Sequence, residues 1–345
     1  MNIFYAKYLL ELKHQFTISY NSRKTTPVVL VKIEENGIDA YGEASLPPYL
    51  PENQETVINY LTEFSHIIKR GYSDIPNIYK LMESIPVQNN PAKAAIDIAL
   101  HDLTGKKEKK TCRELLGIRS NSLPYTSYTI GIDSPEVMRN KIEAAEEYKY
   151  LKIKIGTKDD RKIISQVREI TDKPLYVDVN QGWDNLNEAF EMSKWLADQN
   201  VKLIEQPFKK YNLAGSQWLS ERSPIPIIAD EDAQSLADLE VIKNSFNGIN
   251  IKLMKCAGIN EALKMINYAK KNNLKIMLGC MTETSCAISA ASQLASAADF
   301  IDLDGNALIS NDPFSGHHAS DGKIYLSDKS GLGIDLNKEI EFIKL

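Results

Sequence analysis

Cysteine is scarce in this sequence, and no pair of cysteines has the spacing of a metal or redox motif. The four cysteines stand in apolar segments without a CxxC spacing, so we expect reduced core thiols rather than disulfides or a thiolate metal site. Long apolar runs are also missing, because no segment approaches the roughly 18 residues of a membrane span. These absences favour a soluble, cytoplasmic protein.

Charge of one sign is not concentrated anywhere in the chain. The formal net charge of the 345 residues is -5, and the basic residues are scattered rather than clustered. Such a distribution gives no general attraction to nucleic acid or to an anionic membrane. We therefore expect a small-molecule substrate as the main partner, no nucleic-acid or membrane partner, and a homo-oligomer.

Residues 1–120 carry the signals of an α+β domain. β-Branched runs flank Asn36-Gly37, a dipeptide that favours a two-residue hairpin because both positions tolerate positive φ. Helical patterns follow, one from Pro51 and one from Pro91. The N-terminal region is therefore predicted to begin with antiparallel strands and to continue with helices.

Residues 121–319 show short apolar strands that alternate with amphipathic helices. This alternation predicts a (β/α)7β TIM-like barrel, and residues 320–345, which break the pattern, are expected to return to the N-terminal domain. A doubly wound open sheet is disfavoured because no glycine-rich phosphate fingerprint follows the first strand. The eight predicted strands are 126–130, 151–155, 175–179, 202–205, 227–229, 248–252, 275–279 and 300–304.

Charged residues end most of the predicted strands. In a barrel of this kind the active site lies at the C-terminal ends of the strands. The intervals between successive charges from position 154 to position 252 are 24, 27, 25 and 22 residues, about one βα unit each, so these charges should meet at one mouth. The residues are Lys154, Asp178, Glu205, Asp230 and Lys252, followed on the eighth strand by Asp302 and Asp304.

Three of these charges, Asp178, Glu205 and Asp230, are carboxylates on adjacent strands. Three converging like charges need a cation, and an all-oxygen set without histidine or cysteine suits a hard ion such as Mg²⁺. Three separate surface carboxylates are the alternative, but no arginine ends a neighbouring strand to pair with them. The sequence therefore predicts one Mg²⁺ per subunit.

Two lysines, Lys152 and Lys154, alternate in the strand "KYLKIKIG" and so point to one face. Lys252 ends the sixth strand, opposite the second, so Lys154 and Lys252 should flank the α-carbon of a substrate whose carboxylate is on the metal. Burial, the metal and a second cation can lower a lysine pKa enough for it to act as a base. We expect Lys154 to transfer the proton, and Lys152 to lower the pKa of Lys154 and stabilise a developing enediolate oxygen.

These motifs resemble the muconate-lactonizing subgroup of the enolase superfamily, for which lysine bases and a Mg²⁺-stabilised enediolate are known. The resemblance covers nearly the whole chain, because "YGEA" and "AAIDIALHDLTGK" are similar to the family's capping domain and "GLGIDL" to its tail. It implies a barrel with an N-terminal capping domain that the C-terminal tail completes. The barrel motifs are the KxK of "LKIKIG", "VDVNQGW", "IEQP", "IIADED" and "NIKLMKCAGI".

Within the subgroup, "FIDLDG" resembles the DxD with which dipeptide epimerases hold the substrate ammonium, here Asp302 and Asp304. "TSYTIGID" and "MLGCMTETS" also resemble dipeptide epimerase strands, which implies substrate contacts by Thr129, Cys280 and Met281. The expected activity is inversion of the C-terminal residue of an Ala-Xaa dipeptide by 1,1-proton transfer between two lysines. A cycloisomerase, an o-succinylbenzoate synthase or an N-acylamino acid racemase stays an alternative, as does a metal- or peptide-binding barrel without catalysis.

Histidine and the early loop bear on the reaction and on the substrate. Dehydratases and mandelate-type racemases of the superfamily use a histidine late in the barrel, but His14, His66, His101, His317 and His318 end none of strands five to seven. Ala-Glu epimerases often carry an arginine in the early loop, and ungapped matching places that position at Asn21, two residues before Arg23. We predict that specificity depends on Tyr20, Asn21, Arg23 and residues 45–51, and the second residue of the dipeptide, glutamate or a small or apolar one, stays open.

Overall fold

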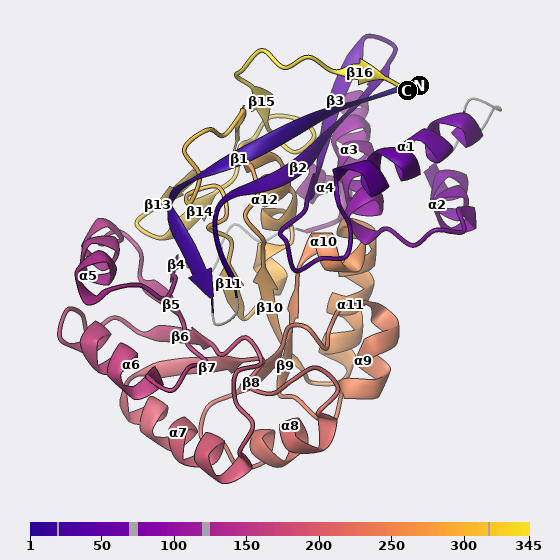
Figure 1. The fold of residues 1–345 in the computed structure, drawn as a ribbon. Coiled ribbons are helices and arrows are strands. Elements are labelled where there is room, and N and C mark those ends of the chain that lie inside the picture. The colour runs from indigo at the N-terminus through magenta and orange to yellow at the C-terminus, as the bar shows by residue number, and fades with distance from the viewer. Residues whose placement is uncertain (19–20, 69–74, 119–124, 317) are drawn as a thin grey trace.

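The computed structural model shows a barrel with a second domain over one of its ends (Figure 1). Tyr20, His317 and the predicted domain boundary at residue 120 fall outside the described residues. None of the helices in the described part of the chain is both long enough and apolar enough to cross a membrane. The structure describes residues 1–18, 21–68, 75–118, 125–316 and 318–345.

The N-terminal domain contains a four-stranded antiparallel sheet. The hairpin at one edge of this sheet turns at Asn36-Gly37, where φ is 53° and 78°, as a two-residue turn between antiparallel strands requires, so the predicted hairpin is confirmed. The last strand of the chain joins the opposite edge of this sheet, and the two termini lie side by side (Figure 1). In spatial order the strands are β16 (Ile343–Lys344), β1 (Asn2–Ile18), β2 (Asn21–Glu35) and β3 (Ile38–Ser45).

Helix α3 packs closely against this sheet. It begins where the Asn89 side chain accepts a hydrogen bond from the Ala92 backbone, with Pro91 in its first turn. A Cβ at Gly42 of β3 would lie 1.9 Å from the Ala95 carbonyl oxygen, so only glycine allows this approach. The helices of the domain are α1 (Gln54–Ile68), α2 (Ile75–Ser84), α3 (Asn90–Glu108) and α4 (Cys112–Leu115).

The barrel is an eight-stranded parallel sheet, which confirms the predicted fold class. A bridge between Thr126 and Ile301 links its first and last strands, and the predicted strands agree with the observed ones to within two residues. Asp230 and Lys252 therefore lie one residue beyond a strand, and Asp304 lies two residues beyond. The strands are β4 (Ser127–Ile130), β5 (Tyr150–Lys154), β6 (Leu175–Asp178), β7 (Val201–Glu205), β8 (Ile227–Ala229), β9 (Gly248–Ile251), β10 (Lys275–Gly279) and β11 (Phe300–Asp302).

Helices surround the barrel (Figure 1), and two short antiparallel pairs of strands follow it in the chain. The helices are α5 (Pro135–Ala144), α6 (Asp160–Arg168), α7 (Leu186–Asp198), α8 (Leu213–Ser220), α9 (Leu236–Ile242), α10 (Leu253–Cys256), α11 (Ile259–Lys271), α12 (Ser285–Ser292) and the 3₁₀ turn η1 (Ala295–Ala297). The pairs are β12 (Phe314–Ser315) with β15 (Asp335–Leu336), and β13 (His318–Ser320) with β14 (Lys323–Tyr325).

Alternation along the strands separates the inside of the barrel from the outside. Outward side chains such as Ile153 and Ile204 share a core with helix residues such as Ile164. Inward side chains form a separate apolar cluster consisting of Tyr176, Leu203, Ile228 and Met277. Two residues further along, three of these four strands carry an inward carboxylate and the fourth carries a glycine, so the apolar layer forms the floor of the site.

Three buried carboxylates join the capping domain to the rest of the chain. Glu43 accepts a hydrogen bond from the Thr284 backbone at the start of α12, with 3.0 Å between the backbone nitrogen and Oε1. Asp97 accepts from the Ile259 backbone at the start of α11, and Asp102 accepts from the backbone of the C-terminal tail. Because unpaired buried N–H groups are costly, these bonds hold the two domains in one arrangement.

Candidate active site

A cavity of about 240 Å³ lies at the mouth of the barrel, beneath the capping domain. Its wall comes from both domains, with Arg23 and Tyr49 on the capping side and Thr129, Lys154 and Lys252 on the barrel side. No histidine of the described residues lines it. Five of the seven predicted strand-end residues therefore line one cavity, namely Lys154, Asp230, Lys252, Asp302 and Asp304.

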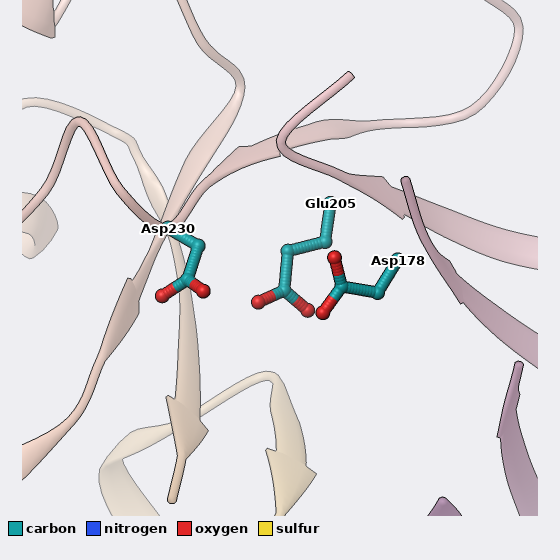
Figure 2. A group of neighbouring side chains, drawn as sticks. All are labelled: Asp178, Glu205 and Asp230. Carbon is teal, nitrogen blue, oxygen red and sulfur yellow. The ribbon is translucent and has the colours of Figure 1, made fainter. Parts of the chain in front are cut away.

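Asp178, Glu205 and Asp230 form an acidic group (Figure 2). Asp230 lines the cavity, and the other two carboxylates contact Lys154 and Lys152, which also line it. One carboxylate oxygen from each residue lies within 4.8 Å of the others, and all three side chains are buried. Three oxygens at this separation can contact one small divalent ion. The triad predicted from the sequence is thus assembled by the fold.

One oxygen of each of these carboxylates is held by a fixed donor of the chain itself. This leaves the second oxygen of each group for another partner and restricts how each carboxylate can rotate. The three bonds are Asn180 N to Asp178 Oδ1 at 3.0 Å, Asn250 Nδ2 to Glu205 Oε1 at 2.7 Å, and Lys255 Nζ to Asp230 Oδ1 at 2.5 Å.

The second oxygen of each carboxylate contacts the ammonium group of a lysine. These ammonium groups supply positive charge at the positions where a cation would contact the oxygens, so the donor set and its charge fit a hard divalent ion such as Mg²⁺. The contacts are Lys154 Nζ to Asp178 Oδ2 at 2.6 Å, Lys152 Nζ to Glu205 Oε2 at 2.6 Å, and Lys252 Nζ to Asp230 Oδ2 at 2.7 Å.

The electrostatics of the group show why it needs positive charge. Burial, and then the charge of the neighbouring Asp178, raise the pKa of Glu205 to about 7. Burial by itself lowers the pKa of Lys152 and of Lys252, but the carboxylates around each lysine outweigh burial, so both pKa values are raised. Both ammonium groups therefore stay charged next to the acidic group.

Asp302 and Asp304 lie on the other side of Lys152. Asp302 Oδ2 is 2.8 Å from Lys152 Nζ, and Asp302 Oδ1 accepts a hydrogen bond from the Ser127 hydroxyl at 2.7 Å. Asp304 Oδ2 accepts from the Thr129 backbone nitrogen at 2.6 Å. Burial, and then the charge of Asp302, raise the pKa of Asp304 to about 7. A cationic group that entered beside Asp304 would favour its ionised form.

Most of the predicted specificity residues named here line the cavity, but one does not. Arg23 lines the cavity, and its Nη2 donates a hydrogen bond to the Thr282 hydroxyl at 3.1 Å. Cys280 and Met281 also line the cavity, and the Tyr49 hydroxyl lies 2.8 Å from the sulfur of Met281. Asn21, by contrast, is not among the residues that line it.

Several residues of the site were not predicted, and four of them show what the sequence could reveal. Asn250 lies two residues before Lys252, and Ser127 two before Thr129, so the period of a strand places them on the inner face. Lys255 follows Lys252 by about one helical turn. Glu231 lines the cavity, and burial, followed by the charge of Asp230, raises its pKa to about 8. The period of a strand could therefore have revealed Asn250 and Ser127, whereas nothing in the sequence distinguishes Glu231 from a surface residue.

The fold and the site together define the enolase type of capped barrel. The family described as "Enolase C-terminal domain-like" matches residues 137–340, and "Mandelate racemase / muconate lactonizing enzyme, N-terminal domain" matches residues 3–117. The L-Ala-D/L-Glu epimerase of Bacteroides thetaiotaomicron is 45% identical over 338 residues, 97% of this chain and 88% of that protein. The chain therefore belongs to the mandelate racemase / muconate lactonizing enzyme family.

Two solved structures resemble the whole chain. The dipeptide epimerase of Cytophaga hutchinsonii, complexed with Mg and the dipeptide D-Ala-L-Val, has a TM-score of 0.92 at 26% identity and covers 100% of this chain and 99% of its own. The N-succinyl Arg/Lys racemase of Bacillus cereus has a TM-score of 0.90 at 30% identity, covering 98% of this chain and 96% of its own. Both likenesses extend over the capping domain and the barrel.

Proposed function

We propose that this protein is a Mg²⁺-dependent dipeptide epimerase that inverts the α-carbon of the C-terminal residue of an Ala-Xaa dipeptide. One observation carries the proposal. Lysines from opposite strands, Lys154 and Lys252, both contact the acidic triad, and Asp302 and Asp304 line the same cavity. The dipeptide epimerases among its relatives support the same assignment.

Asp178, Glu205 and Asp230 would hold the Mg²⁺. When bound, the ion supplies positive charge that stabilises the negative charge developing on the substrate carboxylate as the α-proton leaves. The oxygens available to it are those now contacted by lysine ammonium groups. The other oxygens keep their bonds to donors of the chain and hold the three carboxylates in place.

Lys154 and Lys252 would exchange the proton at the α-carbon. They follow the second and sixth of eight strands, so they approach a substrate between them from opposite faces. A cation held by the triad would offset the carboxylates that keep Lys252 charged. The lysine on one face could then remove the proton as a neutral amine, and the ammonium on the other face would return one, which inverts the centre. Lys152 Nζ lies 2.6 Å from a Glu205 oxygen and 2.8 Å from an Asp302 oxygen, so we assign it to stabilising negative charge on the substrate and not to proton transfer.

Asp302 and Asp304 favour a dipeptide over the alternative substrates. An ammonium group beside them makes charge-assisted hydrogen bonds, whereas an N-acylamino acid, muconate or a succinylbenzoate precursor brings no cation to this position. One of the relatives is named a racemase of N-succinylated amino acids. Comparing free with N-acylated substrates therefore decides between the two activities.

Arg23 supports glutamate as the second residue of the dipeptide. It is a cation in the cavity wall, held by Thr26 and Thr282 and lying 5.1 Å from the centroid of the Phe16 ring. A side-chain carboxylate that reached this wall would pair with the guanidinium. The Bacteroides relative is named for L-Ala-D/L-Glu. Replacing Arg23 by methionine should raise KM for Ala-Glu far more than KM for Ala-Leu, and an equal rise for both would contradict this assignment.

Deuterium exchange tests the proposed function directly. The enzyme is incubated in D₂O and Mg²⁺ with Ala-Xaa dipeptides, and mass spectrometry follows deuterium uptake at the C-terminal α-carbon. We expect uptake together with interconversion of the two epimers, and a binding protein without catalysis would give neither. The homo-oligomer and the cytoplasmic location stay predictions.

A further inference from the structure

We propose that Asn250 is a positioning residue that fixes the orientation of Glu205 in the metal site, and that Gly279 is glycine in order to leave room for its amide. The inference rests on the proposed Mg²⁺ site and concerns how the chain prepares one of its ligands. Asn250 is an uncharged residue within β9, and it has no part in the proton transfer proposed above.

The amide of Asn250 reaches across the inside of the barrel. Its Nδ2 donates to Glu205 Oε1 at 2.7 Å, although β8 lies between the strands that carry the two residues. Asn250 is fully buried, and its Oδ1 has no hydrogen-bond partner among the residues that the structure describes. A buried acceptor without a partner costs stability, so stability alone would favour an apolar side chain here.

Gly279 confines the amide from the opposite side. A Cβ at Gly279 of β10 would lie 2.5 Å from Asn250 Oδ1 and 2.7 Å from Asn250 Nδ2. The φ angle of Gly279 is not positive, so the backbone itself would accept alanine. What excludes a larger residue is the amide of Asn250, which is thus held between Glu205 and the β10 backbone.

A neutral donor suits this position because it does not compete with a cation. Lys152 and Lys252 also approach Glu205, with Nζ to carboxylate oxygen distances of 2.6 Å and 3.9 Å. A divalent ion held by Glu205 would repel both ammonium groups, whereas the hydrogen bond from the neutral Asn250 amide to Oε1 would not oppose it. Asn250 therefore fixes the carboxylate both before and after the ion binds, as residues that orient metal ligands do.

The test measures Mg²⁺ binding to the metal-free protein by titration calorimetry. Asn250→Leu should weaken Mg²⁺ binding by roughly 10–100-fold, the usual effect of losing a residue that orients a metal ligand. Asn247→Leu is the matched control, since Asn247 precedes the same strand and bonds Ile227 and Ser220 at the other end of the barrel. The control should lower the melting temperature without changing the affinity for Mg²⁺.

Gly279→Ala gives a second measurement that leaves Asn250 itself in place. The added methyl group should displace the amide and weaken Mg²⁺ binding in the wild-type background. It should have little further effect in an Asn250→Ala background, where the space is free. Full Mg²⁺ affinity in folded Asn250→Leu and Gly279→Ala variants would overturn the inference. If wild-type protein failed to bind Mg²⁺ at all, the proposed function would fall instead, so the two failures are distinguishable.

Discussion

Replacement of Asp304 by asparagine tests how the site recognises a substrate. The Asp304 carboxylate accepts a hydrogen bond from the Thr129 backbone nitrogen, and the carbonyl of an asparagine can accept the same bond, so the fold should persist. What is lost is the negative charge offered to the substrate ammonium. A hydrogen bond to a charged group contributes about 1.5–3 kcal/mol, so kcat/KM for a free dipeptide should fall roughly 10- to 100-fold.

The assay follows epimerisation at pH 8, because the pKa of Asp304 is raised to about 7 and the carboxylate is mostly ionised there. The control is Asp299→Asn. The Asp299 carboxylate accepts a hydrogen bond from the Ile276 backbone at the opposite end of the barrel, so removing its charge should leave kcat/KM unchanged. N-Acetylation of the dipeptide should lower kcat/KM of the wild-type enzyme by about the same factor as the Asp304→Asn substitution does. Equal turnover of free and acetylated dipeptides by wild type would refute ammonium recognition.

Three further changes test the bases, the metal and the domain joint. Lys154→Ala and Lys252→Ala should each abolish epimerisation, measured by polarimetry, while leaving deuterium exchange of one epimer, and near wild-type epimerisation by either would contradict the two-base mechanism. Chelation should remove activity and Mg²⁺ restore it, and Asp230→Asn should bind Mg²⁺ weakly by calorimetry. Full activity of a demonstrably metal-free enzyme would count against the site. Burial, and then the charge of Glu283, raise the pKa of Glu43 from 4.5 to about 8. Between these two pH values the folded protein keeps a proton on Glu43 that the unfolded chain releases. The free energy of unfolding of the wild type should therefore fall as the pH rises from 4.5 to about 8. Denaturant titrations at pH 6 and pH 9 should show that Glu43→Gln removes roughly 1–4 kcal/mol of this fall, and an identical pH dependence in both proteins would contradict it.

The chemistry of the site was largely predictable from the sequence because it depends on two periods. The period of two along a strand places Lys152 and Lys154 on one face, and the length of a βα unit repeats that placement at Asp178 and Glu205. Both rules are local, so they need no knowledge of packing. The placement of these side chains at one mouth follows from the barrel alone, whereas their roles in proton transfer and metal binding stay predictions.

The substrate-facing wall was less predictable because it depends on how the capping strands lie over the barrel. Asn21 and Arg23 were both predicted, and ungapped matching put the arginine position of related enzymes at Asn21, but only Arg23 lines the cavity. The two residues are two apart on β2, so the period of a strand gives them the same face. That period therefore cannot tell which of the two reaches the cavity. Asn250 was missed for a different reason, since its partner Glu205 is two strands away.

The contacts between the domains imply that substrate preference and chemistry can change separately. The loop after β10 carries Met281 and Thr282 into the cavity wall, and the capping domain holds this loop at several points: Arg23 and Ser45 bond Thr282, Tyr49 contacts Met281, and Glu43 bonds Thr284. None of the triad carboxylates or the two proposed bases takes part in these bonds. A substitution in the capping domain should therefore move the wall that is proposed to meet the second side chain of the dipeptide, and it should leave the bonds that hold Glu205 and Asp230 in place. Differences in substrate among related enzymes with this fold should accordingly concentrate in the capping strands and this loop, and not at the ends of the barrel strands.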